Sequence, residues 1–519
     1  MRRPTTAWMA AALALAAAPP LAAQSETYEQ LQTFSFLLSQ VRLNYVTPVG
    51  TEPLVRAAIE GMLRALDPHS RFVPRAENDL WLAWQSGHAA GTGILVEDED
   101  GSLTVAAVAR GSSAAREGIL PGDRVLAVND TLVAGSPAHT VQMQLLGDEG
   151  RKIRLRLARG AWAQPETLTV TVRNQTLHPH SVGLGRQIER TGYVRLDEFQ
   201  EQAPKELRDA VEHALSGLRV RRLVLDLRGN PGGAVTAAVE IASQFLAKDL
   251  VVCRTVGRRA EMDRSFTSTG DHPFIDLPMV VLIDRHTASA AEILAGALQD
   301  HDRAAILGRR SFGKALIQRL FPVPPNGDAA WLTVGFVHSP SGRLIQRRYA
   351  GLTADQYYAL GGRGGAEQDT AATYKTDSGR TVRGGGGIAP DSELPAPVPP
   401  PLWWSIAADS GFDLAVADSV APTLGSDAAS RAAWPDDTTG WRLRLLRPFL
   451  DRVRSRLHVT AATDSGQDVQ IAEVLARRAA EVRWGADAAE EFALHNDPDL
   501  RAAIAWLERT HPAEAAGRH

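Results

Sequence analysis

One segment near the middle of the chain constrains the fold most, because it has the pattern of a strand, a helix and a second strand in succession. The apolar run Met279–Ile283 predicts a buried parallel strand, and Glu292–Gln299 has apolar positions at helical spacing. A second apolar run, Ala304–Leu307, predicts the next strand. Ser289 stands in a run of small residues where the first strand gives way to the helix. The segment therefore predicts an α/β domain with a polar side chain at a strand-to-helix junction.

Ser289 and Lys314 are candidates for a nucleophile and its general base. A helix start offers unpaired backbone N–H groups and a partial positive charge, which suit an oxyanion. Lys314 follows the second strand, and a lysine acts as a base only where burial lowers its pKa well below about 10.4. Phe312, Leu316 and Ile317 give Lys314 an apolar setting. The competing interpretation is a capping serine and a solvated lysine.

A glycine-rich turn follows another strand pattern. Arg222–Leu227 is an apolar run, and the turn Arg228–Gly233 reads RGNPGG ahead of a helix that begins near Ala234. A turn of this kind between strand and helix exposes N–H groups as an anion site. A tight turn without chemistry is the alternative.

Several of these segments resemble the carboxy-terminal processing peptidases, or tail-specific proteases, of peptidase family S41. The resemblance lies in TASAAEILAGALQD and in GRRSFGKALIQ, where the serine, a Phe-Gly-Lys motif and a later glutamine come in the family's order. It implies that Ser289 is the nucleophile, Lys314 the general base and Gln318 the residue that positions the lysine. It further implies that the N–H groups of Gly233 and Ala290 form the oxyanion hole.

The segment 89–174 is similar to a PDZ domain of the form found in bacterial secreted proteases. The similarity lies in the loop GTGI and in LTVAAVARGSSAAREGILPGDRVLAVND. It implies that the loop residues Gly91, Thr92, Gly93 and Ile94 bind the C-terminal carboxylate of a peptide, while strand addition supplies the other contacts. Leu146 stands where many relatives carry a basic residue, which puts a regulatory ion pair of that residue in doubt. A structural β-domain with an unused groove is the alternative.

The resemblance covers roughly residues 30–392 and implies a crotonase-like α/β serine protease core with an inserted PDZ domain. We predict a signal peptide at 1–23, an N-terminal helical segment at 24–88, the PDZ domain at 89–174 and the catalytic domain at 175–394. A Pro-rich linker at 395–401 then leads to a C-terminal helical extension at 402–519, with Trp403, Trp404 and Trp441 as apolar anchors.

Composition and the N-terminus restrict location and partners. Arg2 and Arg3 precede an Ala/Leu-rich run that ends in Leu21-Ala22-Ala23, a pattern typical of a signal peptide, so we expect a periplasmic or secreted protein. An uncleaved anchor helix is the alternative for this run. Balanced charge, with 56 basic and 60 acidic residues, favours no nucleic-acid partner. The only cysteine, Cys253, has no partner for an internal disulfide and reads as core.

Three motifs suggest other chemistry but fit it poorly. GRRSFGKA nearly fits a phosphate-binding loop, yet Ala315 replaces the hydroxyl residue that would hold magnesium. His286 precedes Ser289 without a GxSxG elbow, and His69 follows Pro68, which favours a turn role. No HExxH or CxxC motif supports a metal site, and the resemblance implies no cofactor.

The sequence therefore predicts a secreted or periplasmic serine endopeptidase that recognises protein C-terminal tails through its PDZ domain and cleaves by a Ser-Lys mechanism. Its partners would be proteins or peptides with free C-terminal tails, and the helical extension could mediate homo-oligomers or bind an adaptor. A non-catalytic peptide-binding adaptor on the same scaffold is the competing hypothesis. An acyl-CoA enzyme is a further alternative, against which the signal peptide and the PDZ-like segment argue.

Overall fold

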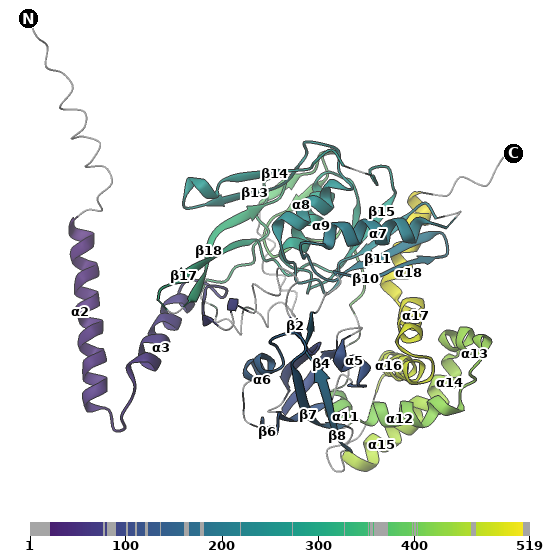
Figure 1. Cartoon of the computed structure of the whole chain (residues 1–519). Helices are drawn as coiled ribbons and strands as arrows, with labels where there is room; N and C mark the ends of the chain where they lie inside the picture. The colour runs from purple at the N-terminus through teal and green to yellow at the C-terminus, as the bar shows by residue number, and fades with distance from the viewer. Residues whose placement is uncertain are drawn as a thin grey trace, which may run out of the picture.

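The computed structural model describes residues 21–511 except 76–77, 80–89, 100–101, 109–111, 120–122, 135, 137, 160–165, 177–180, 218–219, 272, 326, 351, 353–356, 358–371, 397, 399–400, 402, 410 and 458–462. Two helices, α2 (Leu21–Asn44) and α3 (Thr51–Arg64), open the described chain. Figure 1 shows α2 standing apart from the rest of the molecule. Most of the predicted signal peptide, residues 1–20, lies outside the described residues.

A six-stranded sheet forms the centre of the peptidase domain, in the order β10-β11-β12-β15-β16-β21. All neighbouring pairs are parallel except β10 with β11. The strands are β10 (Val182–Ile188), β11 (Thr191–Leu196), β12 (Leu223–Asp226), β15 (Met279–Ile283), β16 (Ala305–Gly308) and β21 (Ser392–Glu393). The predicted strand–helix–strand unit is confirmed, with α9 (Ala290–Asp300) between β15 and β16.

Alternate residues of these strands face two different layers, as expected for a sheet covered on both sides. On one face Leu225 and Val281 join the core formed with α7 (Ala203–Leu215), α8 (Val235–Ser243) and α9. On the other face Val224 and Leu282 pack against α18 (Pro498–Thr510), the last helix of the chain. The C-terminal extension thus supplies one of the two layers that bury the catalytic sheet.

A second sheet adjoins this core and receives the N-terminal segment. Its order is β1-β18-β13-β14, and β17 also pairs with β18. The strands are β1 (Arg71–Val73), β13 (Val251–Gly257), β14 (Arg264–Thr267), β17 (Leu316–Val323) and β18 (Asp328–His338), and η1 (Ala260–Met262) lies between β13 and β14. Cys253 is buried in β13, which confirms its predicted place in the core. A hairpin, β19 (Thr373–Lys375) with β20 (Thr381–Arg383), precedes β21.

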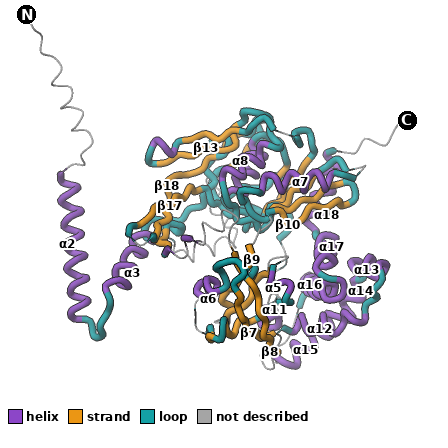
Figure 2. The backbone as a smooth tube through the Cα atoms, in the orientation of Figure 1, coloured by secondary structure: helices purple, strands orange, loops and turns teal. Residues whose placement is uncertain are grey.

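The PDZ domain is a separate β-rich body below the peptidase domain in Figure 2. Its main sheet has the order β3-β4-β5-β7-β8, with β6 beside β5, while β2 pairs with β9. The strands are β2 (Ala90–Gly91), β3 (Ile94–Glu99), β4 (Ser102–Val108), β5 (Arg124–Val128), β6 (Thr131–Leu132), β7 (Lys152–Arg159), β8 (Glu166–Arg173) and β9 (Gln175–Thr176). Two short helices, α5 (Ser113–Arg116) and α6 (Ala138–Gln144), complete it.

The C-terminal extension is helical, as predicted. Before α18 it contains α11 (Trp404–Asp409), α12 (Phe412–Val420), η3 (Ala421–Thr423), α13 (Ala428–Ala433), η4 (Trp434–Asp436), α14 (Thr438–Trp441), η5 (Arg442–Leu446), α15 (Arg447–Leu457), α16 (Ser465–Trp484) and α17 (Ala486–Asn496). Trp403 and Trp441 are buried in its own apolar core, and Trp404 packs against that core. The predicted mixed α/β architecture with N-terminal and C-terminal helical parts is confirmed. The exact domain boundaries stay predictions.

No helix among the described residues is long and apolar enough to cross a membrane.

Candidate active site

Ser289 lies at the carboxyl edge of the central sheet, immediately before α9. Its φ of 56° and ψ of −118° are unusual for a residue with a side chain. Such conformations cost about 1–3 kcal/mol and persist only where surrounding contacts enforce them. Here the backbone of the preceding turn is held by Thr287, whose hydroxyl donates to the Leu227 carbonyl at 2.8 Å. The strained junction places the predicted nucleophile at the end of the strand β15.

Glu292 is the side chain that ties the serine to the lysine. It lies in the first turn of α9, is 1% exposed, and its carboxylate accepts from the backbone N–H of Ser289 at 2.9 Å. The same carboxylate accepts from the N–H groups of Gly313 at 2.7 Å and Lys314 at 2.8 Å, and from the Ser311 hydroxyl. Burial raises the pKa of Glu292, and these four donors oppose that rise. One buried carboxylate therefore fixes both loops on which the predicted dyad depends.

Lys314 lies in the loop between β16 and β17, and its side chain is largely buried. Burial lowers its pKa below the ordinary lysine value, and the negative charges of Glu292 and Asp67 act in the opposite direction. Ser289 and Lys314 line the same small cavity, with Cys253 on the wall. Within the described part of the chain, no hydrogen bond joins the Ser289 hydroxyl to the Lys314 amine. Catalytic hydrogen bonds often tighten only when substrate binds.

The glycine turn after β12 lies directly against the serine. A Cβ added at Gly232 would come within 2.7 Å of the Ser289 Cβ, so only glycine fits there. The Gly232 N–H already donates to the Asn230 side chain at 2.8 Å. By contrast, the N–H groups of Gly233 and Ala290 donate to no acceptor among the described residues. This arrangement leaves the two predicted oxyanion-hole donors available.

Gln318 and His69 meet beside the lysine. The Gln318 side-chain amide donates to the His69 carbonyl at 2.9 Å, so it holds the N-terminal segment rather than an atom of Lys314 in this structure. His69 is buried, and its ring packs edge-on against Tyr357 at 5.1 Å. The backbone N–H of His69 donates to the Asp67 carboxylate at 2.8 Å, which agrees with the predicted turn role. The pKa of His69 is lowered to about 4, mainly by burial and secondly by the charge of Lys314, while the charge of Asp67 acts in the opposite direction.

The predicted carboxylate loop lies at the start of β3 in the PDZ domain. Gly93 has a φ of 87°, which explains the glycine at that position. The Thr92 N–H donates to the Leu145 carbonyl at 3.2 Å, and the Ile94 N–H points to the Thr92 hydroxyl at 3.4 Å. Gly91 forms an isolated bridge with Leu146. The N–H groups of Thr92 and Ile94 are therefore engaged within the domain, and Gly91 also pairs with Gln175 of β9.

The open edge of β3 is occupied by a side chain of α6. Among the described strands β3 pairs only with β4, and α6 contacts β3. Gln142 donates from its amide nitrogen to the Ile94 carbonyl at 3.0 Å, and its amide oxygen accepts from the Val96 N–H at 2.8 Å. An added peptide strand would need these two backbone groups. Gln142 thus stands where the backbone of a bound tail would lie.

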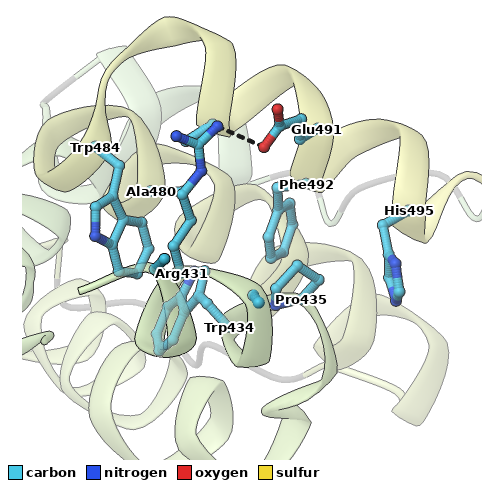
Figure 3. A pocket seen from close by; sticks show the side chains of 11 residues that line it. Arg431, Trp434, Pro435, Ala480, Trp484, Glu491, Phe492 and His495 are labelled. Atoms are coloured by element: carbon cyan, nitrogen blue, oxygen red, sulfur yellow. Dashed lines mark hydrogen bonds and ion pairs between the residues drawn. The ribbon is translucent and has the colours of Figure 1, made fainter. Parts of the chain in front are cut away.

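Another hollow, of about 280 Å³, lies within the C-terminal extension, as Figure 3 shows. Trp434, Trp484 and Phe492 line it, and Arg431 pairs with Glu491 at its rim. Glu491 also accepts from Arg186 of β10 at 2.9 Å, so this part of the extension contacts the peptidase sheet. All lining residues belong to the extension, and none belongs to the predicted catalytic set.

Sequence reasoning missed Glu292 and Gln142. A usable signal for Glu292 was its position three residues after Ser289, the spacing of a capping box, at the start of the otherwise apolar run 290–298. Gln142 carries no comparable signal, because its role depends on which edge of β3 the helix α6 covers. In the described ranges, no group of three or more His, Cys, Asp or Glu side chains could hold a metal ion.

Comparison with known proteins agrees with this geometry. A model of peptidase family S41 matches residues 190–358, and a PDZ domain model matches residues 104–159. A carboxy-terminal-processing protease of Bartonella bacilliformis is 33% identical over 335 residues, which cover 64% of this chain and 76% of that protein. A carboxyl-terminal-processing protease of Synechocystis is 33% identical over 313 residues, 59% of this chain and 72% of that protein.

The structure of a photosystem II D1 C-terminal processing protease matches with 25% identity and a TM-score of 0.41, over 69% of this chain and 86% of that one. The strand-to-helix serine, the buried lysine and the two family matches lead to one assignment. The chain belongs to peptidase family S41, as a serine-type C-terminal-processing peptidase that carries a PDZ domain.

Proposed function

We propose that this peptidase cleaves peptide bonds near the C-terminus of proteins through a Ser289–Lys314 dyad, after its PDZ groove has bound the free tail. The observation that carries the proposal is the buried position of Lys314 in the same cavity as Ser289. Its lowered pKa means that a larger fraction of the amine is neutral, and only the neutral amine accepts a proton.

The reaction follows from these positions. The Lys314 amine removes the proton from the Ser289 hydroxyl, and the serine oxygen attacks the scissile carbonyl. The N–H groups of Gly233 and Ala290 bind the oxyanion that forms. Lys314 then gives its proton to the leaving amine, which releases the C-terminal fragment and leaves an acyl-serine ester. Water, deprotonated by the same lysine, attacks the ester carbonyl. Lys314 then returns the proton to the Ser289 oxygen, which releases the shortened protein with a new C-terminal carboxylate and restores the free enzyme.

Gln318 has a supporting role in this proposal. Its amide binds the His69 carbonyl, and His69 lies close enough to Lys314 for the lysine charge to affect its pKa. Gln318 thereby links the lysine loop to the N-terminal segment. The loop Gly91–Ile94 would receive the carboxylate of the tail, and the edge of β3 would pair with the residues before it. We further propose that the mature protein works in the periplasm or outside the cell, as the N-terminal sequence pattern suggests.

The test is cleavage of an unfolded protein with an apolar C-terminal tail. We expect the parent to cut, and Ser289→Ala and Lys314→Ala each to lose at least about a thousand-fold in rate, since nucleophile and base act as one unit. Circular dichroism and tail-peptide affinity should stay at parental values in both variants. A parent that binds tails but never cuts them, with or without partners, would instead support the adaptor hypothesis.

A further inference from the structure

The C-terminal extension returns to the peptidase domain at the carboxyl edge of the catalytic sheet. We propose that Asp497 and Asp499, at the start of α18, are positioning residues that hold the oxyanion turn and the lysine loop in register. The inference rests on the proposed dyad. It gives a positioning role to a part of the chain that lies outside both matched family regions, residues 104–159 and 190–358.

Asp499 bridges the two loops directly. Its carboxylate binds Arg228 Nη1 at 3.1 Å, and it binds Arg309 through both guanidinium Nη atoms, Nη2 at 3.0 Å. The Asp499 side chain is 8% exposed, so these contacts are largely shielded from water. A single carboxylate of the extension therefore joins two arginines that belong to two different loops of the peptidase domain.

Asp497 strengthens the same contact from the N-cap of α18. It accepts from Arg228 Nη2 at 2.5 Å and from the backbone N–H groups of Asp499 and Leu500 at 2.9 and 3.1 Å. On its other side Arg228 pairs with Asp226 at 2.6 Å, and Asp226 accepts from the Tyr193 hydroxyl at 2.7 Å. Arg228 is thus held between the end of β12 and the start of α18.

Both arginines lie where a shift would reach the catalytic groups. Arg228 opens the turn that ends at Gly233, and Arg309 opens the loop that leads to Lys314. The two loops leave the sheet at the same edge, because β12 and β16 are parallel and flank β15. The Asn230 carbonyl in the first loop accepts from the Ala288 N–H at 2.9 Å, next to Ser289. Movement of either arginine would displace the nucleophile and its base relative to one another.

Charge burial explains why this contact is specific. Ionised side chains removed from water must be paired, and losing one partner of a buried pair is costly. Without Asp499, Arg309 would lose its bidentate carboxylate partner and Arg228 would lose one of three. The apolar residues Leu500 and Leu507 bind α18 to the sheet independently of these charges. The helix can therefore stay docked while the loops lose their common partner.

The first experiment compares Asp499→Asn with Glu508→Gln in the full chain. Glu508 lies on the same helix and pairs with Arg222 at 3.7 Å, but its side chain is 53% exposed. For Asp499→Asn we expect kcat to fall about a hundred-fold with little change in KM, since small displacements of catalytic groups have effects of this order. Labelling of Ser289 by a fluorophosphonate should slow in parallel. The Glu508→Gln control should stay within about two-fold of the parent, because the contact of Glu508 with Arg222 is longer than a hydrogen bond, Glu508 itself is exposed, and Arg222 is in neither of the two loops.

Asp497→Ser removes the ion pair with Arg228 and keeps the helix cap, since serine also caps helices well. We expect this variant to lose less activity than Asp499→Asn while α18 remains folded. Hydrogen exchange over residues 227–233 and 309–316 should speed up in Asp499→Asn and not in Glu508→Gln. Hydrogen exchange tests the contact of Asp499 with the two loops even if the parent protein does not cleave. A parent without cleavage activity would count against the proposed function and not against this contact. Parental rates of hydrogen exchange and of labelling in Asp499→Asn would overturn the inference. So would a loss of kcat that appears only at temperatures where the variant has begun to unfold.

Discussion

The catalytic centre and the peptide groove both contain backbone groups that are predicted to bind substrate, and the two sites differ in whether these groups are already occupied. Around Ser289, the buried Glu292 carboxylate accepts from the N–H groups of Ser289 and Lys314, while the N–H groups of Gly233 and Ala290 donate to no acceptor in the described part of the chain. In the groove, a partly buried side chain from α6, Gln142, occupies the edge of β3 itself. The first site is organised before substrate arrives, whereas the second must release a contact in order to bind.

This difference follows from what each site has to do. Electrostatic stabilisation of an oxyanion requires donors that are fixed before charge develops. Recognition of a tail requires only that new backbone hydrogen bonds replace old ones at small net cost. The comparison predicts large losses when the contacts of the catalytic centre are changed and small gains when Gln142 is removed.

The largest effect is expected for Glu292→Gln. Each carboxylate oxygen accepts from two donors, and the amide would replace one oxygen with an NH2 group, so two buried donors would lose their acceptor and face another donor. We expect a loss of about 2–4 kcal/mol in the free energy of unfolding and a fall in kcat of at least about a hundred-fold. Urea denaturation and steady-state kinetics measure the two quantities. Glu240→Gln, on the neighbouring helix α8, is a suitable control, because Glu240 forms no contact with either catalytic loop among those described.

Activity close to that of the parent in Glu292→Gln would mean that the two loops hold themselves in place. The contrast between a fixed centre and an adaptable groove would then be wrong.

Local patterns predicted the catalytic scaffold well. Met279–Ile283 appears as β15 with the predicted bounds, and the helix after Ser289 begins at Ala290. Such elements are predictable because apolar periodicity determines which face is buried. The glycine turn was also placed correctly between β12 and α8. Its close approach to Ser289 explains physically why glycine is needed at Gly232.

The contacts that span the chain could not be predicted in this way. Asp499 and Arg228 are separated by more than half the chain, and no local pattern indicates that α18 covers the catalytic sheet. The predicted role of Gln318 toward the lysine also depends on tertiary geometry, and its amide meets His69 instead. Long-range ion pairs and edge contacts depend on the docking of whole elements, which sequence periodicity does not encode.

A smaller effect is expected in the pH profile. In the proposed mechanism only neutral Lys314 accepts the serine proton, so kcat/KM should rise with pH by about tenfold per unit until the lysine has lost its proton. Burial lowers the pKa of Lys314, so the plateau should begin clearly below its ordinary value of about 10.4. Rates of peptide cleavage from pH 5 to 11, with stability checked at each pH, measure this rise of kcat/KM with pH. A rise that begins only near pH 10 would contradict a buried base.

The same shift has a consequence for stability. The folded chain holds Lys314 with a depressed pKa, so as pH falls below the unfolded-state value the unfolded chain binds the proton first, and folding becomes less favourable. Lys314→Met should therefore be inactive yet melt at a higher temperature than the parent near neutral pH. Equal melting temperatures at pH 7 would indicate that the lysine is solvated.

The smallest effect is expected at the groove, where removal of a competing side chain should strengthen tail binding. In a Ser289→Ala background, which prevents cleavage, Gln142→Ala should bind an apolar C-terminal peptide about three- to ten-fold more tightly, since each hydrogen bond it gives up is worth only about 0.5–1.5 kcal/mol. Gln144→Ala, on the same helix α6, serves as the matched control and should leave the affinity unchanged. Fluorescence anisotropy of a labelled peptide measures both. Weaker binding in Gln142→Ala would show that Gln142 contacts the tail instead of competing with it, and the groove would then be preorganised as the catalytic centre is.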